Sequence, residues 1–116
     1  MIVEDEWLVR LEAADALEEA GWKILEAGSG EQAAALLECS HIDLLVTDIR
    51  ISGAMTGWEV AEMVRATSPE TAVIYASANT AIESRQVSGS IFVSKPTVMT
   101  TLVAASEHLW SKAPSR

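Results

Sequence analysis

The sequence predicts an α/β fold in which a parallel β-sheet lies between two layers of helices. Short apolar segments rich in β-branched residues alternate along the chain with longer amphipathic segments. The apolar segments are too short for helices and too continuous for strands with one wet face, which is typical of parallel strands covered on both sides. Right-handed crossovers between successive strands then favour a doubly wound, three-layer sandwich.

The spacing of apolar residues places the strands and two of the helices along the chain. Five segments are expected to be strands: residues 1–3, 22–27, 42–47, 71–76 and 90–94. Two helices are indicated by apolar residues at i, i+4, i+7 and i+11, the spacing of one helix face. These residues are Val9, Ala13, Ala16 and Ala20 in the first helix, which Gly21 ends, and Val98, Leu102, Ala105 and Leu109 in the last.

Three further helices have marked starts. Each start has a Ser or Thr followed three residues later by Glu or Gln, a capping box in which both side chains satisfy backbone amides of the first turn. The pairs are Ser29 and Gln32, Thr56 and Glu59, and Thr80 and Glu83. Five β-α units result. The fourth helix is expected to be short, because only 18 positions separate Ser77 from Lys95.

Length and composition indicate a single domain, residues 1–116, with one hydrophobic core region. The one cysteine, Cys39, cannot form an internal disulfide, and the sequence shows neither a signal peptide nor an apolar stretch of membrane-spanning length. A cytoplasmic protein is therefore expected. The formal net charge of -9, from 17 acidic and 8 basic residues, repels nucleic acid and argues against direct DNA binding.

Charged residues follow three of the predicted strands. Glu4 and Asp5 come after the first strand, Asp48 after the third and Lys95 after the fifth. Open α/β sheets bind ligands just outside the carboxyl ends of their strands, so these side chains are expected to converge there. Carboxylates at close range repel one another and need a counter-ion. A hard divalent cation that prefers oxygen ligands suits them, and Mg²⁺ is the expected choice.

The same strand ends offer the groups needed to bind a phosphoryl group. Lys95 supplies a compact ammonium, and Ser77, after the fourth strand, supplies a hydroxyl that can donate a hydrogen bond. Because phosphoryl transfer depends mainly on alignment and charge stabilisation, these residues predict transfer of phosphate onto Asp48. Taken alone, a strand-end aspartate more often caps a turn, so the prediction depends on the motifs together.

The order of these motifs resembles that of the receiver domain of two-component response regulators, over essentially the whole chain. The motifs are Glu4-Asp5, Asp48, Ser77-Ala78 and Lys95-Pro96 after the first, third, fourth and fifth strands. The resemblance implies a flavodoxin-like α/β/α sandwich, whose five-stranded parallel sheet has the order 2-1-3-4-5 with the site at its switch point. It also implies a signalling receiver rather than an enzyme. Such a receiver catalyses only its own phosphorylation and dephosphorylation.

The resemblance also implies the roles of the acidic residues. Asp48 would accept a phosphoryl group from a phosphohistidine. Glu4, Asp5 and Asp48 would hold Mg²⁺ together with the backbone carbonyl of Arg50.

Ser77 and Lys95 would, by the same resemblance, bind the phosphoryl oxygens. Phe92 matches the aromatic position that turns inward when relatives are phosphorylated. A phosphate of about -1.5 to -2 charge would draw Ser77 toward it and vacate space for the ring. The alternative is that Phe92 is an ordinary core residue.

The implied partners are proteins. The donor would be a sensor histidine kinase or a histidine phosphotransfer protein, and the signal would pass to a downstream output domain or target protein. A homodimer is compatible with the resemblance, whereas contact with a membrane or with nucleic acid is not expected. Receivers use their first helix to dock the donor. In this helix, Trp7, Leu8 and Leu11 lie outside the predicted apolar face. Either they contribute to docking or the helix has a broad core face.

Two other functions are compatible with parts of the pattern. A phosphohydrolase of the haloacid dehalogenase type needs a second acid two residues after its aspartate, where this chain has Arg50. A degenerate receiver would bind proteins without being phosphorylated, because a fold does not guarantee chemistry. Retention of all five site residues argues against it. The first strand begins at the first residue and leaves three residues before Glu4, where a longer strand is usual in the family, so whether this strand is truncated stays open.

Overall fold

The computed structural model describes residues 1–78, 85–95 and 99–112. Their elements, in chain order, are β1 (Ile2–Val3), α1 (Trp7–Glu19), β2 (Glu26–Ala27), α2 (Gly30–Leu37), β3 (Leu44–Thr47), α3 (Gly57–Thr67), β4 (Ala72–Ser77), β5 (Ile91–Ser94) and α4 (Met99–Lys112). The helix predicted to start at Thr80 lies outside the described residues. Among the described helices, none has the length and apolar character needed to cross a bilayer.

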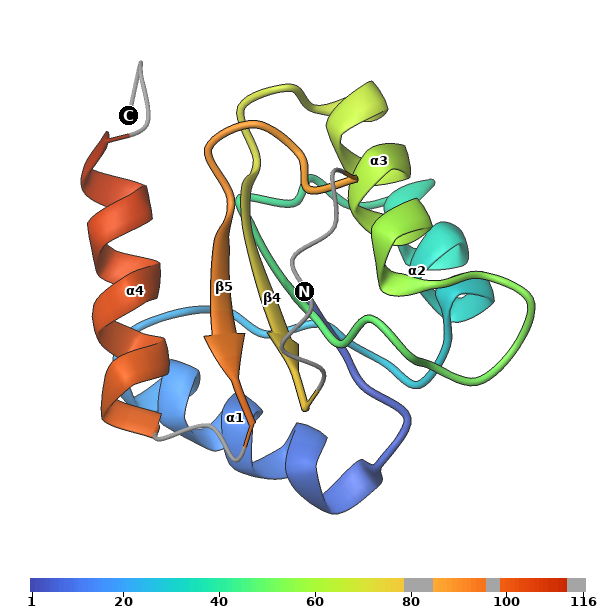
Figure 1. Cartoon of the computed structure of the whole chain (residues 1–116). Coiled ribbons are helices and arrows are strands. Elements are labelled where there is room, and N and C mark those ends of the chain that lie inside the picture. Colours follow the sequence, from blue (N-terminus) through green and yellow to red (C-terminus); the bar gives the residue numbers. More distant parts are fainter. Residues whose placement is uncertain (79–84, 96–98, 113–116) are drawn as a thin grey trace.

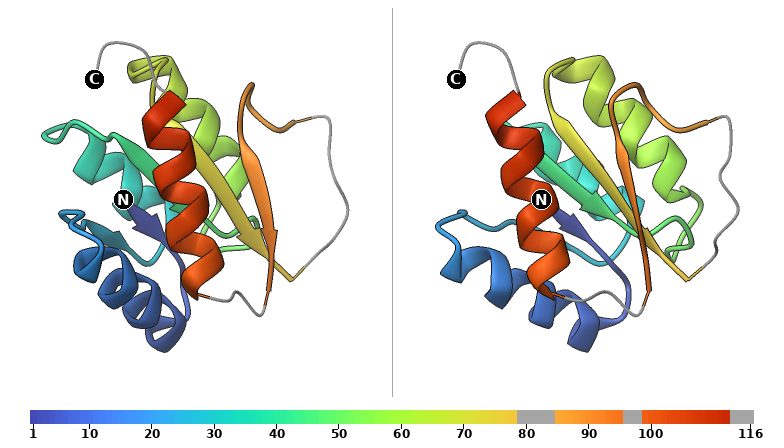
Figure 2. Two further views of the ribbon diagram at one scale, coloured as in Figure 1. Left: turned by 90° about the vertical axis from the view of Figure 1, so that its left-hand side faces the viewer. Right: turned by 60° about the vertical axis from the view of Figure 1, so that its left-hand side comes forward.

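All five strands run parallel in one sheet, in the order β2-β1-β3-β4-β5. Helices α1 and α4 cover one face of the sheet, and α2 and α3 cover the other (Figure 1). Figure 2 shows the same three layers from two further directions. The predicted flavodoxin-like sandwich with strand order 2-1-3-4-5 is confirmed.

Neighbouring strand residues enter two separate hydrophobic cores, because successive side chains point to opposite faces of a sheet. Leu45 and Val73 belong to the core under α2 and α3. Leu44 and Ile74 belong to the core under α1 and α4. All four side chains are buried. Burial on both faces explains why these strands are continuous apolar runs in the sequence.

The first two strands are short. β2 contains only Glu26–Ala27, although residues 22–27 were predicted. Its ladder partner is β1, which itself has two residues. The length of β2 is therefore limited by its neighbour in the sheet. The apolar pattern of residues 22–27 therefore does not predict which of these residues pair with β1.

The buried face of α1 differs from the predicted one. Its buried residues are Ala13, Ala14 and Leu17, whereas Val9 and Ala20 of the predicted stripe are exposed. Burying a leucine side chain stabilises a fold more than burying an alanine does. The helix is therefore turned so that Leu17 enters the core. Of the predicted stripe, Ala13 is buried and Ala16 is partly buried, and the prediction is wrong for Val9 and Ala20.

The predicted starts of α2 and α3 are confirmed. The Ser29 hydroxyl accepts a hydrogen bond from the Gln32 N–H at 3.2 Å. Thr56 and Glu59 form a complete capping box. Both helices follow loops that leave the carboxyl ends of strands, so their first turns lie beside that edge of the sheet.

The opposite edge of the sheet, where the strands begin, holds the amino group of Met1. This group is buried and donates to the Leu44 carbonyl at 2.7 Å. Burial lowers the pKa of the amino group to about 6, and the charge of Asp43 only partly opposes the shift. Trp22 and Trp110 pack edge to face nearby, with ring centroids 5.3 Å apart.

Candidate functional site

Three carboxylates meet at the edge of the sheet where the strands end. Glu4 and Asp5 follow β1, and Asp48 follows the neighbouring strand β3. One carboxylate oxygen from each residue lies within 4.8 Å of the other two. Glu4 is buried, Asp48 is partly buried and Asp5 is exposed. The cluster is therefore closed at Glu4 and open to solvent at Asp5.

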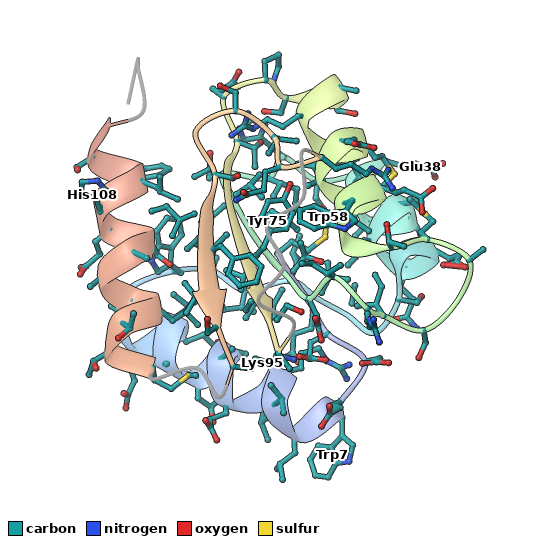
Figure 3. All side chains as sticks on the ribbon, viewed as in Figure 1. Trp7, Glu38, Trp58, Tyr75, Lys95 and His108 are labelled. Carbon is teal, nitrogen blue, oxygen red and sulfur yellow. The ribbon has the colours of Figure 1, made fainter. Side chains whose placement is uncertain are left out.

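Lys95 brings an ammonium group to this cluster from the end of β5. Its Nζ atom donates to Glu4 Oε1 and, at 2.8 Å, to Asp48 Oδ2. Figure 3 shows Lys95 at the end of the strands, between α1 and the sheet edge. The structure thus brings together the four charged residues that the sequence places after β1, β3 and β5.

Burial and charge act in opposite directions on the paired groups. Burial raises the pKa of Glu4, and the hydrogen bond from Lys95 only partly offsets this. Burial alone would lower the pKa of Lys95, but hydrogen bonds to Asp48 and Glu4 outweigh it and raise that pKa. Lys95 is therefore held as a cation at neutral pH, the state needed to bind an anionic oxygen.

Asp48 is held in a defined orientation. Its Oδ1 atom accepts a hydrogen bond from the Ile49 N–H at 2.7 Å. The Gly57 N–H donates to the Ile49 carbonyl at 2.7 Å, and a Cβ atom at Gly57 would lie only 1.9 Å from the Asp48 carbonyl oxygen. Only glycine permits so close an approach. The start of α3 therefore packs directly on the backbone of Asp48.

Asp5 is oriented by a residue far away in the sequence. The Ser52 hydroxyl donates to Asp5 Oδ2 at 3.0 Å. Burial alone would raise the pKa of Asp5, but the hydrogen bond from Ser52, further hydrogen bonds and the charge of Lys95 together outweigh it and lower the pKa. Sequence reasoning missed Ser52, because no local pattern links it to a carboxylate 47 positions earlier.

The other predicted site residues lie around this cluster. Ser77 is buried at the end of β4, and its carbonyl accepts a hydrogen bond from the Lys95 N–H at 2.9 Å. Arg50 is exposed in the loop after Asp48. Phe92, on β5, is partly buried against the core under α2 and α3. Ser77 thus reaches the same edge as Asp48, whereas Phe92 lies further back along its strand.

Three large apolar side chains of α1 are exposed near this edge. The exposed fractions of Trp7, Leu8 and Leu11 are 65%, 62% and 41%. Figure 3 shows Trp7 projecting from the start of α1 at the same end of the molecule as Lys95. A broad core face on α1 is therefore excluded as the explanation of these residues. We call Trp7, Leu8 and Leu11 the α1 patch.

The donor set of the acidic cluster fits a hard divalent cation. Glu4, Asp5 and Asp48 offer carboxylate oxygens from two strand ends, within reach of a single ion. Mg²⁺ is commonly bound through one or two carboxylates and keeps several waters, which the exposed side of Asp5 permits. A cation there would also compensate the charge of the buried Glu4.

The fold and the site define a known class of signalling domain. A family model described as the response regulator receiver domain matches residues 1–107. The chain therefore belongs to the receiver domain family of two-component response regulators.

Solved structures and curated sequences support this assignment. A response regulator receiver protein from Sinorhizobium medicae has a similar structure, with a TM-score of 0.91 and 32% identity over 96% of this chain and 92% of that chain. The receiver domain of the hybrid histidine kinase CckA is also similar, with a TM-score of 0.81 and 30% identity over 94% of this chain and 95% of that chain.

The curated relatives are longer proteins. The probable transcriptional regulatory protein TcrX from Mycobacterium tuberculosis is 30% identical over 100 residues, which is 83% of this chain and 42% of TcrX. The transcriptional regulatory protein PdtaR from the same organism is 40% identical over 52 residues, which is 44% of this chain and 25% of PdtaR. The matched parts are therefore less than half the length of these relatives.

Proposed function

We propose that residues 1–116 act as one receiver domain that takes a phosphoryl group onto Asp48 in a Mg²⁺-dependent reaction. The observation that carries this proposal is the hydrogen bond from Lys95 Nζ to Asp48 Oδ2, made beside the carboxylates of Glu4 and Asp5. Asp48 thus lies between a cation that can bind phosphoryl oxygens and acids that can hold a metal. Charge placed in advance around the reacting atoms is what phosphoryl transfer needs.

The proposed donor is a phosphohistidine of a sensor histidine kinase or a histidine phosphotransfer protein. A carboxylate oxygen of Asp48 forms a bond to phosphorus while the bond from phosphorus to the histidine nitrogen breaks, and that nitrogen keeps the electron pair. Attack of water on phosphorus later releases phosphate and restores the carboxylate. The chain thus acts on its own aspartate and returns to its starting state.

Two groups bind the transferred phosphoryl oxygens in this proposal. Lys95 is already a cation bonded to Asp48, so its Nζ atom needs only a short shift to reach an oxygen of the phosphoryl group. The hydroxyl of Ser77 approaches from the neighbouring strand β4.

The metal ligands follow from the acidic cluster. Glu4, Asp5 and Asp48 would hold Mg²⁺, joined by the backbone carbonyl of Arg50 in the adjoining loop. When bound, the ion neutralises negative charge on the transferring group. The chain's own contribution is to fix the carboxylates. Ser52 orients Asp5, and the Ile49 N–H orients Asp48.

The proposed output is a change in the surface near β4 and β5. Phosphorylation adds about -1.5 to -2 charge at Asp48 and draws Ser77 toward it. Phe92 pairs with Tyr75 in the ladder between β4 and β5 and is only partly buried, so its ring can move inward. A downstream output domain or target protein would recognise the altered surface.

The α1 patch is the proposed docking surface for the histidine donor, since it is apolar and exposed, and Trp7 lies at the same end of the molecule as Lys95 in Figure 3. Trp7→Ala and Leu11→Ala should slow phosphotransfer from a phosphohistidine protein without slowing phosphorylation by a small phosphodonor. Equal rates for the variants and the unaltered chain with the protein donor would count against docking at this surface.

The test of the proposed function is incubation with Mg²⁺ and acetyl phosphate, followed by intact-protein mass spectrometry. We expect the mass of one phosphoryl group to be gained by the unaltered chain and not by Asp48→Asn. Asp15→Asn is the matched control, because Asp15 is an exposed aspartate on α1, and it should gain the group normally. No gain in the unaltered chain, or a gain that persists in Asp48→Asn, would overturn the proposal and favour a degenerate receiver.

A further inference from the structure

The loop between β3 and α3, residues 48–56, is hydrogen-bonded to the acidic cluster on one side. Ser52 lies in this loop and donates its hydroxyl to Asp5 Oδ2 at 3.0 Å. Arg50, whose carbonyl is a proposed metal ligand, lies in the same loop two residues earlier. The position of the loop therefore affects two of the proposed ligands together.

The other side of this loop contacts the first turn of α2 and the residue before it. Glu31 Oε2 accepts a hydrogen bond from the Ala54 N–H at 3.2 Å. Ser29, just before α2, forms a parallel bridge with Ser52. A Cβ atom at Gly30 would lie 2.5 Å from the Cβ atom of Met55, so the loop packs closely on the helix there.

Gly53 shows how closely the Glu31 carboxylate is seated on the loop. Its φ angle is 96°, in the left-handed region that favours glycine. A Cβ atom at Gly53 would lie 2.6 Å from each carboxylate oxygen of Glu31. The Glu31 side chain therefore occupies the space beside the Gly53 backbone and bonds to the next amide along the chain.

We propose that Glu31 is a positioning residue for the metal site, acting through residues 52–54 on Asp5 and on the Arg50 carbonyl. This inference rests on the proposed function, since it concerns the affinity of the acidic cluster for Mg²⁺. Glu31 is outside the cluster and does not contact the ion in this proposal. Its carboxylate fixes the loop that orients two of the ligands, and an oriented ligand loses less freedom when it binds a metal.

The inference is tested by titrating the chain with Mg²⁺ in calorimetry. Residues that orient metal ligands typically change affinity by about tenfold or more, and Glu31 acts at one further remove. We therefore expect Glu31→Ala to weaken Mg²⁺ binding by about threefold to tenfold. Glu31→Gln keeps an oxygen that can accept from Ala54 and should bind within about twofold of the unaltered chain.

Two controls separate positioning from charge and from folding. Glu38→Ala removes the same charge from an exposed position just after α2 and should leave Mg²⁺ binding unchanged. In the Ser52→Ala background the loop has lost its hydrogen bond to Asp5, so Glu31→Ala should have a smaller effect than in the unaltered chain. Urea unfolding without Mg²⁺ verifies that each variant is folded at the titration temperature.

Several outcomes would overturn the inference. These are equal Mg²⁺ affinity in Glu31→Ala and the unaltered chain, an equal loss in Glu31→Gln, or full additivity with Ser52→Ala. Each of them leaves the proposed function intact, provided that the unaltered chain binds Mg²⁺ and is phosphorylated. Absence of Mg²⁺ binding in the unaltered chain would instead count against the proposed function itself.

Discussion

The two edges of the sheet hold amino groups with opposite pKa shifts, a partly buried one at Lys95 and a buried one at Met1. At the carboxyl edge, Lys95 Nζ bonds to the carboxylates of Glu4 and Asp48, and its pKa is raised. At the amino edge, the Met1 amino group bonds to the Leu44 carbonyl, and its pKa falls to about 6. Burial disfavours the charged form of both groups.

Burial and charged partners together decide the charge state. The Met1 amino group is the more deeply buried of the two, its hydrogen-bond partner is an uncharged carbonyl, and the charge of Asp43 only partly compensates its desolvation. Two carboxylates do compensate the desolvation of Lys95. The topology creates this asymmetry, because the loops that leave β1 and β3 begin with acidic residues and meet Lys95 at one edge.

The largest expected effect comes from removing the cation at the carboxyl edge. Lys95→Met leaves Glu4 buried beside Asp48 without its partner, and breaking a buried pair in this way costs about 3 kcal/mol or more. We expect that loss in the free energy of unfolding at pH 7 without Mg²⁺. The loss should shrink on acidification, because protonation removes the uncompensated charge of Glu4, whose pKa is already raised by burial.

Urea unfolding at pH 7 and pH 5 measures this loss. Lys23→Met is the control, since Lys23 is exposed and a surface substitution usually changes stability by no more than about 0.5 kcal/mol. Equal losses in the two variants would show that the pair at the carboxyl edge does not stabilise the fold.

The next largest effect concerns the amino edge. The pKa of the Met1 amino group is about 6 in the folded chain, against 8.0 for an ordinary amino terminus. Between these values the unfolded chain binds more protons, so stability rises with pH, by up to about 2.7 kcal/mol, and is constant above that window. Below pH 6 the amino group is protonated in both the folded and the unfolded chain, so stability no longer changes with pH and lacks the gain reached at high pH.

Acetylation of the amino terminus removes this titration. The difference in unfolding free energy between the free and the acetylated chain should therefore change with pH between 6 and 8 and not above. A pH-independent difference would mean that the amino group is solvated in the folded chain.

The smallest of these effects is stabilisation by Mg²⁺ at the carboxyl edge. Binding to the folded state alone stabilises by about 1.4 kcal/mol at ten times the dissociation constant. The effect should be reduced in Asp5→Asn, whose side chain is an exposed member of the cluster. Binding of Mg²⁺ should also leave the titration of the Met1 amino group unchanged, because distant sites act additively. Thermal unfolding with matched ionic strength measures both, and coupling of the two effects would contradict the independence of the two edges.

The sequence alone predicts the layers, the strand order and the charged residues of the site. Strands such as β3 and β4 are buried on both faces, so their apolar runs are visible without a structure. Glu4, Asp48 and Lys95 are predictable because each directly follows a strand, and parallel strands end at one edge.

What the sequence did not predict depends on contacts between distant segments. The rotation of α1 depends on how Leu17 fits the core, and the length of β2 depends on β1. The hydrogen bonds of Ser52 and Glu31 join segments that are 47 and 23 positions apart in the sequence. No residue pattern within one segment encodes these contacts.

The hydrogen bond from the Lys95 N–H to the Ser77 carbonyl has a practical consequence for spectroscopy. It joins the backbones of the two residues proposed to bind the phosphoryl oxygens, at the ends of adjacent strands. A displacement of either strand end alters this one bond, and with it the chemical shift and the solvent exchange rate of a single amide proton. Under the proposed function, phosphorylation of Asp48 should therefore shift the Lys95 amide resonance in a nuclear magnetic resonance spectrum.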